Sequence, residues 1–155
     1  MKHFSFAILT FALSFVHLNA QEAADQSALG KQVYMTVCVA CHQPTGQGLP
    51  MVFPPITNSE YVSGSPERLA AMILKGNIGP ITVDGKLYNN MMPGQEALLT
   101  DEKIAAVMTY VRSNFGNTAP AVAVDLVAAA RKKYLDRKTP WTEAELKAFD
   151  TAPAQ

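Results

Sequence analysis

The stretch of the sequence whose residue types and spacing are best suited to chemistry is Cys-Val-Ala-Cys-His at residues 38–42. Cys38 and Cys41 stand three positions apart, and His42 follows directly. Such a group could belong to a zinc site, a thiol–disulfide pair or an attachment site for haem. Each of these chemistries needs different partners, so the rest of the chain decides between them.

The N-terminus affects that choice, because residues 1–20 have the layout of a secretory signal peptide. A short basic start precedes an apolar run from Phe4 to Leu18, and polar residues follow Ala20. The alternative is a membrane anchor, but the run is short for a span and contains several polar side chains. We expect cleavage after Ala20 and a soluble, exported protein, most simply a periplasmic one.

Cleavage would leave His42 as the only histidine, and Cys38 and Cys41 as the only cysteines, of about 135 residues, which suffice for one domain. A structural zinc site wants four ligands, mainly Cys and His, and a thioredoxin-like pair needs a strand–helix pattern that is missing. The 13 basic and 13 acidic residues form no basic block, which argues against nucleic-acid binding. No later segment is apolar and long enough to span a membrane.

Haem attachment uses all three residues. In C-x-x-C-H the two thiols add to the haem vinyl groups, and the histidine binds the iron. On a helix these positions lie on one side, so Cys38, Cys41 and His42 can meet one porphyrin face. The motif therefore favours a covalently bound haem c.

A six-coordinate iron needs a second axial ligand. Without a second histidine, the candidates are a methionine, a lysine or an open site. Two methionines, Met91 and Met92, lie in the turn-rich segment 85–95, well after the cysteines, where a loop can reach the opposite face. The other methionines are better explained by core packing or by closeness to the motif: Met35, Met51, Met72 and Met108.

Three helices are predicted around this motif. The first spans about residues 27–40, with a stripe of Leu29, Val33, Val37 and Ala40. The second begins after Ser65 as N-cap, has Pro66 in its first turn and stops at Gly76. The third begins at Thr100, with Leu99 and Ile104 spaced as a hydrophobic staple, and ends at Gly116.

Three segments of the sequence resemble class I monohaem cytochromes c, particularly bacterial soluble and dehydrogenase-associated cytochrome domains. They are GKQVYMTVCVACHQPTGQGLPMVFPPI (30–56), LKGNIGPITVDGKLYNNMMPG (74–94) and LTDEKIAAVMTYVRSNFGN (99–117). The resemblance covers about residues 27–117 and implies an all-α cytochrome c fold, with three core helices and long loops wrapped round one covalent haem. We expect this domain to span residues 21–117. The resemblance further implies that the first and last core helices cross at Gly30, close to Tyr110.

The resemblance also implies roles for single residues. The family's methionine ligand directly precedes the proline, which selects Met92; Asn90 stands where the family has glycine. The carbonyl of Pro54, with Pro55 as a rival, would accept a hydrogen bond from His42, and Ile56 would contact the haem. Tyr88 and Asn89 would position the methionine loop.

These features predict an electron carrier and not an enzyme. A dehydrogenase would be the donor, and an oxidase or another cytochrome the acceptor. Two alternatives remain: a tightly bound electron-transfer subunit of a periplasmic dehydrogenase, and a haem enzyme or sensor with an open iron. Because residues 34–59 and 87–95 contain no Asp, Glu, Lys or Arg, we expect them to frame an apolar docking face at the haem edge. The competing arrangement brings Lys75 and Lys86 to that rim.

Residues 118–155 form a predicted C-terminal helical extension. Asp125 is a candidate N-cap for one helix. A capping box of Thr142 and Glu145, with Trp141 and Leu146 as a staple, predicts another. The extension could lie against the first domain or present a surface for a partner, and we favour the first arrangement.

Overall fold

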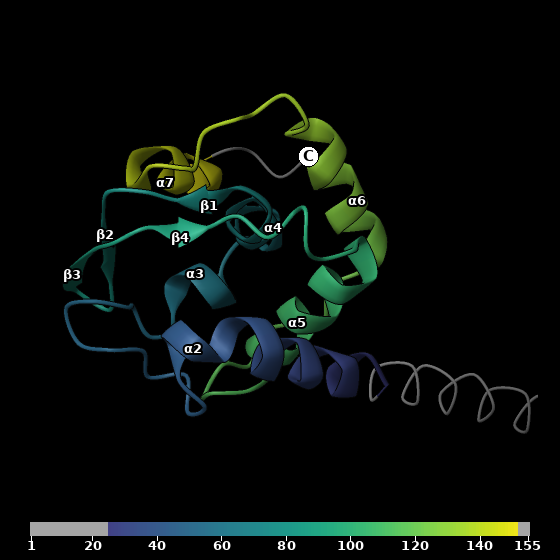
Figure 1. Ribbon diagram of the computed structural model, residues 1–155, viewed down its shortest axis with the longest axis horizontal. Coiled ribbons are helices and arrows are strands. Elements are labelled where there is room, and N and C mark those ends of the chain that lie inside the picture. The colour runs from purple at the N-terminus through teal and green to yellow at the C-terminus, as the bar shows by residue number, and fades with distance from the viewer. Residues whose placement is uncertain (1–24, 152–155) are drawn as a thin grey trace, which may run out of the picture.

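The structure is a computed structural model that describes residues 25–151; the predicted signal peptide, residues 1–20, lies outside them. Its helical elements are residues 25–33, the π-helical turn η1 (Tyr34–Cys38), α2 (Val39–His42), α3 (Glu60–Ser63), α4 (Pro66–Lys75), α5 (Asp101–Ser113), α6 (Val124–Lys133) and α7 (Glu143–Thr151) (Figure 1). Its strands are β1 (Gly76–Asn77), β2 (Pro80–Val83), β3 (Lys86–Asn89) and β4 (Met92–Pro93).

The first helix runs without a break through residues 25–42 and carries a π-helical turn that ends at the first cysteine, Cys38. The N–H of Val39 bonds to the carbonyl of Tyr34, so one turn holds an extra residue and the later side chains are rotated. The predicted apolar stripe therefore ends early. Ala40 is exposed, whereas Tyr34, which the stripe omits, is 1% exposed.

The ends of α4 follow the prediction closely. The Ser65 side chain accepts a hydrogen bond from the N–H of Arg68, Pro66 is the first helical residue, and Gly76 ends the helix with φ +75°. These signals act within one turn of the chain, which is why the sequence reveals them.

The start of α5 also agrees with the prediction, and its end does not. Thr100 caps the first turn by accepting a hydrogen bond from Lys103. The helix ends at Ser113, three residues before Gly116. Gly116 has φ +82°, so it serves the turn that follows the helix.

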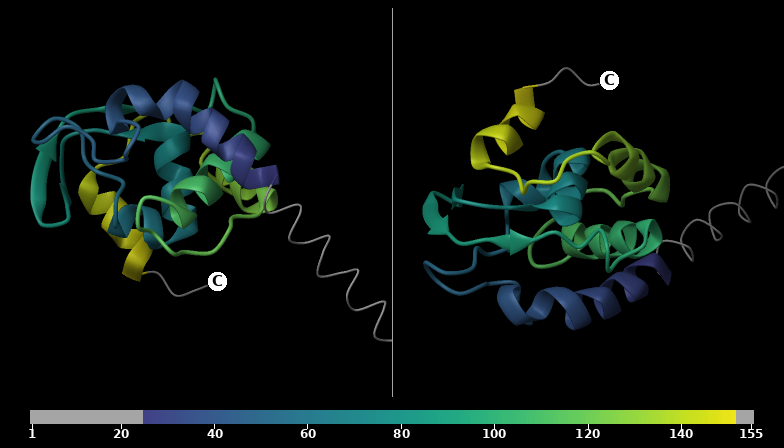
Figure 2. Two further views of the ribbon diagram at one scale, coloured as in Figure 1. Left: turned by 90° about the horizontal axis from the view of Figure 1, so that it is seen from below. Right: turned by 45° about the horizontal axis from the view of Figure 1, so that its top comes forward.

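Gly30 lies where the first helix crosses α5. A Cβ at this position would lie 2.1 Å from the carbonyl oxygen of Ala106 and 2.7 Å from Cβ of Tyr110. The predicted crossing is confirmed, and it leaves no room for a side chain. Figure 2 shows the two helices side by side, with α7 on the opposite side of the molecule.

Two short antiparallel strand pairs were not expected for an all-α chain. β1 pairs with β4, with Asn77 opposite Met92, and β2 pairs with β3. These strands have two to four residues, too few for an alternating pattern to stand out in the sequence. An all-α description therefore leaves out the segment that carries Met92.

The C-terminal segment packs against the rest of the described chain. α6 lies on α4 and α5, and α7 lies on α4 and β2. α6 begins after Ala123, so Asp125 lies in its first turn and is not the N-cap that the sequence suggested. The predicted capping box before α7 is present, with Thr142 N–H donating to Glu145 Oε2 at 2.8 Å.

The buried apolar residues form two clusters. The first joins the N-terminal helix, α4, α5 and α6. The second cluster consists of Tyr61, Ala71, Met72, Ile81, Val83, Tyr88, Trp141 and Leu146. Both clusters contribute side chains to one cavity between them.

Candidate functional site

A large, mainly apolar cavity lies between the N-terminal helix and the strands, and Cys38, Cys41, His42 and Met92 all line it. Its apolar lining includes Val37, Phe53, Ile56, Val62, Leu69, Ile73, Ile81, Val83, Leu99 and Val107. Fifty positions separate His42 from Met92 in the sequence, and the fold brings them to the same cavity. A planar apolar cofactor with a central metal matches this combination of walls and donors.

The two cysteines stand at the end of the N-terminal helix and form no disulfide with each other. Burial, and next the charge of Cys41, raise the pKa of the Cys38 thiol to about 11. Such a thiol stays protonated at neutral pH, unlike the thiolate of a reactive cysteine. Within residues 25–151 no three His, Cys, Asp or Glu side chains gather in a way that could hold a metal ion.

His42 has a fixed orientation. Its Nδ1 lies 3.1 Å from the carbonyl oxygen of Pro54, the contact that the family resemblance implied. A carbonyl can only accept, so Nδ1 carries the proton and Nε2 keeps its lone pair for a metal. Burial lowers the pKa of this imidazole, which favours the same neutral form.

Met92 is half-buried on β4 and lines the cavity, whereas the neighbouring Met91 is 53% exposed at its edge. The strand is held by its pairing with β1 and by a hydrogen bond from Gln95 N–H to the carbonyl of Ile73, 2.8 Å long.

The other predicted pocket residues divide into two groups. Pro54, Ile56 and Tyr88 line the cavity, and Tyr88 is 5% exposed. Asn89 is exposed on β3 and lies outside the lining, whereas Asn90 contributes to it.

Tyr61 is a cavity residue that was not predicted from the sequence. It lies on α3, a helix of one turn, which is too short for a periodic signal. The residue is 4% exposed, and its hydroxyl has no hydrogen-bond partner among the described residues. Burial raises its pKa to about 12, so it is a neutral donor. An unpartnered buried donor fits a ligand with carboxylates, and haem carries two.

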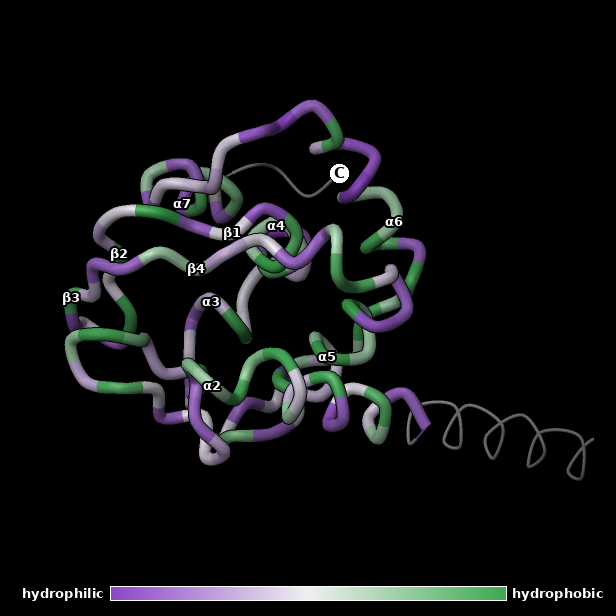
Figure 3. Tube along the Cα trace, in the orientation of Figure 1, coloured by the Kyte–Doolittle hydropathy of each residue, from purple (hydrophilic) through white to green (hydrophobic). Residues whose placement is uncertain are grey.

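The two segments that supply Phe53 and Tyr88 to the cavity lining also carry exposed apolar side chains, which we call the rim. Among them Met51 is 84%, Leu87 is 64% and Met91, which itself lines the cavity, is 53% exposed. Figure 3 shows hydrophobic residues in the loop that follows α2. Lys75 does not reach this rim, because its side chain is buried and its Nζ lies 2.5 Å from Glu96 Oε2.

Known proteins are similar to this chain in sequence. The cytochrome c family model matches residues 27–115, more than half of the chain. Cytochrome c-552 of Thermus thermophilus is 38% identical over 92 residues, which cover 57% of this chain and 69% of that protein.

Dehydrogenase subunits are also similar to the chain. The cytochrome c subunit of the quinone alcohol dehydrogenase of Gluconobacter oxydans is 33% identical over 61% of the chain. The fructose dehydrogenase cytochrome subunit of Gluconobacter japonicus is 36% identical over 66% of the chain. The chain spans only about a fifth of either subunit, 20% and 22% respectively.

The cavity and the sequence similarities to known cytochromes indicate the same cofactor. A haem c bound covalently is the cofactor of such a domain, and Cys38 and Cys41 have the spacing for its attachment. The cavity offers that group an apolar lining, nitrogen and sulfur donors and the unpartnered Tyr61 hydroxyl. The chain therefore belongs to the cytochrome c family, as a class I monohaem member that carries electrons and is not itself an enzyme.

Proposed function

We propose that this protein is an exported, periplasmic carrier of single electrons whose haem iron is bound by His42 and Met92. The observation that carries the proposal is that both side chains line one apolar cavity together with the two cysteines. Bound haem c supplies an iron that alternates between two oxidation states. The protein residues have to hold that iron, exclude water and leave one edge accessible.

Of the two proposed iron ligands, His42 is the stronger electron donor. The carbonyl of Pro54 holds the His42 ring and polarises its Nδ1–H, which makes Nε2 more electron-donating. The methionine side supplies a soft thioether, which favours the reduced metal and raises the reduction potential. With both positions filled, no site is left for a substrate, which favours a carrier over an open-iron enzyme or sensor.

The ligand assignment is tested by absorption spectroscopy. The oxidised protein should show the weak long-wavelength band that arises from sulfur-to-iron charge transfer. Met92→Ala should abolish this band and lower the potential, and the neighbouring Met91→Ala should leave both unchanged. If Met92→Ala retains the band, Met92 is not the ligand; binding of carbon monoxide without displacement of a ligand would favour the open-iron alternative.

The electron would enter and leave at the apolar rim formed by Leu49, Met51, Val52, Leu87 and Met91. These residues are exposed, and the two surrounding sequence segments contain no charged side chain. A redox protein with an equally apolar, weakly charged patch fits this face, and a dehydrogenase as donor with an oxidase or another cytochrome as acceptor would meet that requirement.

A tightly bound dehydrogenase subunit is the second candidate. The similarity to cytochrome subunits of alcohol and fructose dehydrogenases favours it. Size-exclusion chromatography of native extracts, followed by the haem absorption, distinguishes the two. Elution at the mass of a monomer supports a free carrier, and co-elution with dehydrogenase activity supports a subunit.

Export and domain layout are parts of the same proposal. Residues 1–20 would be removed as a signal peptide, residues 21–117 would form the cytochrome domain and residues 118–155 a helical extension. No helix among residues 25–151 has the length and apolar character needed to cross a bilayer. Mass spectrometry of the haem protein from a periplasmic fraction tests this, because cleavage after Ala20 predicts a defined mass.

A further inference from the structure

Contacts of Trp141 extend from the C-terminal segment to β1, the strand that pairs with the Met92 strand β4. β1 is the middle segment of three. On one side it pairs with β4, with Asn77 opposite Met92. On the other side it bonds to Trp141, whose N–H donates to Gly76 O at 2.9 Å and whose carbonyl accepts from Ile78 N–H at 2.8 Å.

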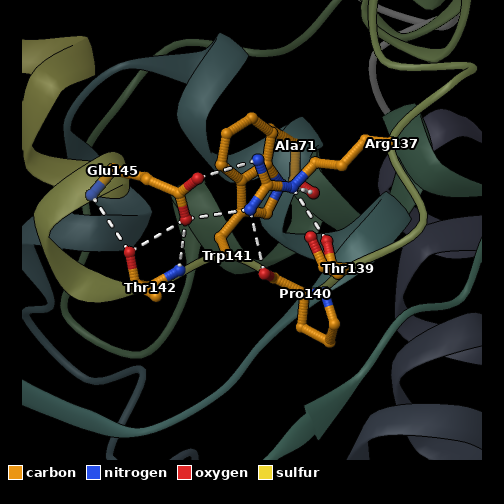
Figure 4. Close-up of polar contacts among 7 residues, drawn as sticks. All are labelled: Ala71, Arg137, Thr139, Pro140, Trp141, Thr142 and Glu145. Atoms are coloured by element: carbon orange, nitrogen blue, oxygen red, sulfur yellow. Dashed lines mark hydrogen bonds and ion pairs between the residues drawn. The ribbon is translucent and has the colours of Figure 1, made fainter.

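Trp141 is itself firmly held. Its indole Nε1–H donates to the carbonyl of Ala71 on α4 at 2.9 Å, and the residue is 7% exposed. The guanidinium of Arg137 lies 3.6 Å above the ring and makes two hydrogen bonds to Glu145, at 2.9 and 2.8 Å (Figure 4). Charge-assisted pairs of this geometry fix a side chain well. The ring is therefore a rigid block between α4 and the C-terminal segment.

β1 and β4 are in unusually close contact. A Cβ at Gly76 would lie 2.1 Å from the carbonyl oxygen of Met92. A displacement of β1 must therefore displace the backbone of Met92 as well. Beyond β4, Lys75 and Glu96 secure the loop, but the residues before it, from Asn89 to Met91, are exposed. Segments with so few buried contacts open at low free energy unless another element holds them.

We propose that Trp141 is a positioning residue for Met92: it braces β1 against α4 and so keeps the paired β4 directed at the iron. The inference rests on the proposed ligation by Met92. Loss of the indole would raise the population in which Met92 has left the metal. The apparent affinity of an added ligand scales with that population, so it measures the effect.

The experiment is an imidazole titration of the oxidised, haem-loaded full-length protein. Trp141→Ala should bind imidazole about tenfold more tightly than the unaltered protein. Trp141→Phe keeps an aromatic ring but loses the hydrogen bond to Ala71, and it should bind about fivefold more tightly. This second variant keeps the test valid if Trp141→Ala does not fold.

The matched control is Val127→Ala. Val127 is fully buried in the C-terminal segment, on α6, but belongs to the first apolar cluster and not to the one that holds Trp141. It should lower overall stability while leaving imidazole affinity within about twofold. Equal affinities in the Trp141 variants and in Val127→Ala would overturn the positioning role. If Met92→Ala retains the sulfur-to-iron band, the ligand assignment fails instead, and the positioning role fails with it.

Discussion

The two sides of the cavity are built differently. His42 ends a helical run over residues 25–42, in which each backbone bond joins residues a few positions apart. Met92 lies on a two-residue strand whose supports, β1 and Trp141, are 15 and 49 positions away along the chain. One ligand depends on local structure and one helix crossing, and the other depends on a chain of long-range contacts. Ligation by His42 should therefore be lost only when the whole protein unfolds, whereas ligation by Met92 should be lost while the rest of the protein is still folded.

The largest effect is expected from breaking the crossing that supports the histidine side. In Gly30→Leu the new Cβ would lie only 2.1 Å from the carbonyl oxygen of Ala106. The N-terminal helix and α5 must therefore separate. We expect a loss of more than about 3 kcal/mol in the free energy of unfolding. Denaturant unfolding, followed by circular dichroism and haem absorption, should show both signals lost in one transition.

The control for this variant is Gln32→Ala, an exposed position on the same helix. It should change stability by less than about 0.5 kcal/mol. Two separate transitions in Gly30→Leu would contradict the idea that the histidine side and the fold are one unit.

A smaller effect is expected on the methionine side from Leu146→Ala. Leu146 is fully buried in the second cluster beside Trp141. Its truncation should cost about 3 kcal/mol. Because the loss falls on the segment that braces β1, the sulfur-to-iron band should disappear at a lower temperature than the helical signal. The exposed Leu98→Ala serves as control, and coincident transitions in Leu146→Ala would remove the distinction between the two sides.

The same contrast explains what the sequence could predict. The starts of α4 and α5, the capping box of α7 and the Gly30 crossing were predicted, since caps act within one turn and the crossing follows from the family resemblance. The β1–β4 pair and the contact of Trp141 with β1 were not, because they join distant segments and leave no periodic signal. The π-helical turn also escaped prediction, and with it the burial of Tyr34.

The site shows a similar division. The cysteines, His42 and the candidate Met92 could be named from a motif and a resemblance. Tyr61 could not, because a single buried hydroxyl is defined by what surrounds it in three dimensions and not by its neighbours in sequence.

A modest pH effect is expected at the ion pair that holds Trp141. The hydrogen bonds and charge of Arg137 lower the pKa of Glu145 from about 4.5 to about 2. Because the folded pKa is depressed, the contribution of Glu145 is complete above pH 4.5 and is lost as the pH falls towards 2. The side chain is 42% exposed, so solvent screening limits the contribution to about 1 kcal/mol.

Thermal unfolding between pH 6 and pH 2 checks this. Glu145→Gln should be less stable than the parent at pH 6 and equal to it near pH 2. A difference that stays constant over this range would show that the ion pair contributes nothing through its charge.

The smallest effect is expected from ionic strength on the rate of electron transfer. With an apolar rim, the rate of oxidation by hexacyanoferrate(III) should change by less than about twofold between low and physiological ionic strength. Met51→Lys places a cation at the most exposed rim position, and should create a clear fall of the rate with salt. A steep salt dependence of the unaltered protein would show that Lys86 or another cation governs approach to the rim.

Trp141 is the only tryptophan in the sequence, which gives the chain a built-in optical reporter. It belongs to the same buried cluster as Ile81 and Tyr88, which also line the cavity. At this short range the haem should quench its emission almost completely. A rise in fluorescence would then mark the moment when the C-terminal segment lifts away, and time-resolved emission could follow that motion in the unlabelled protein.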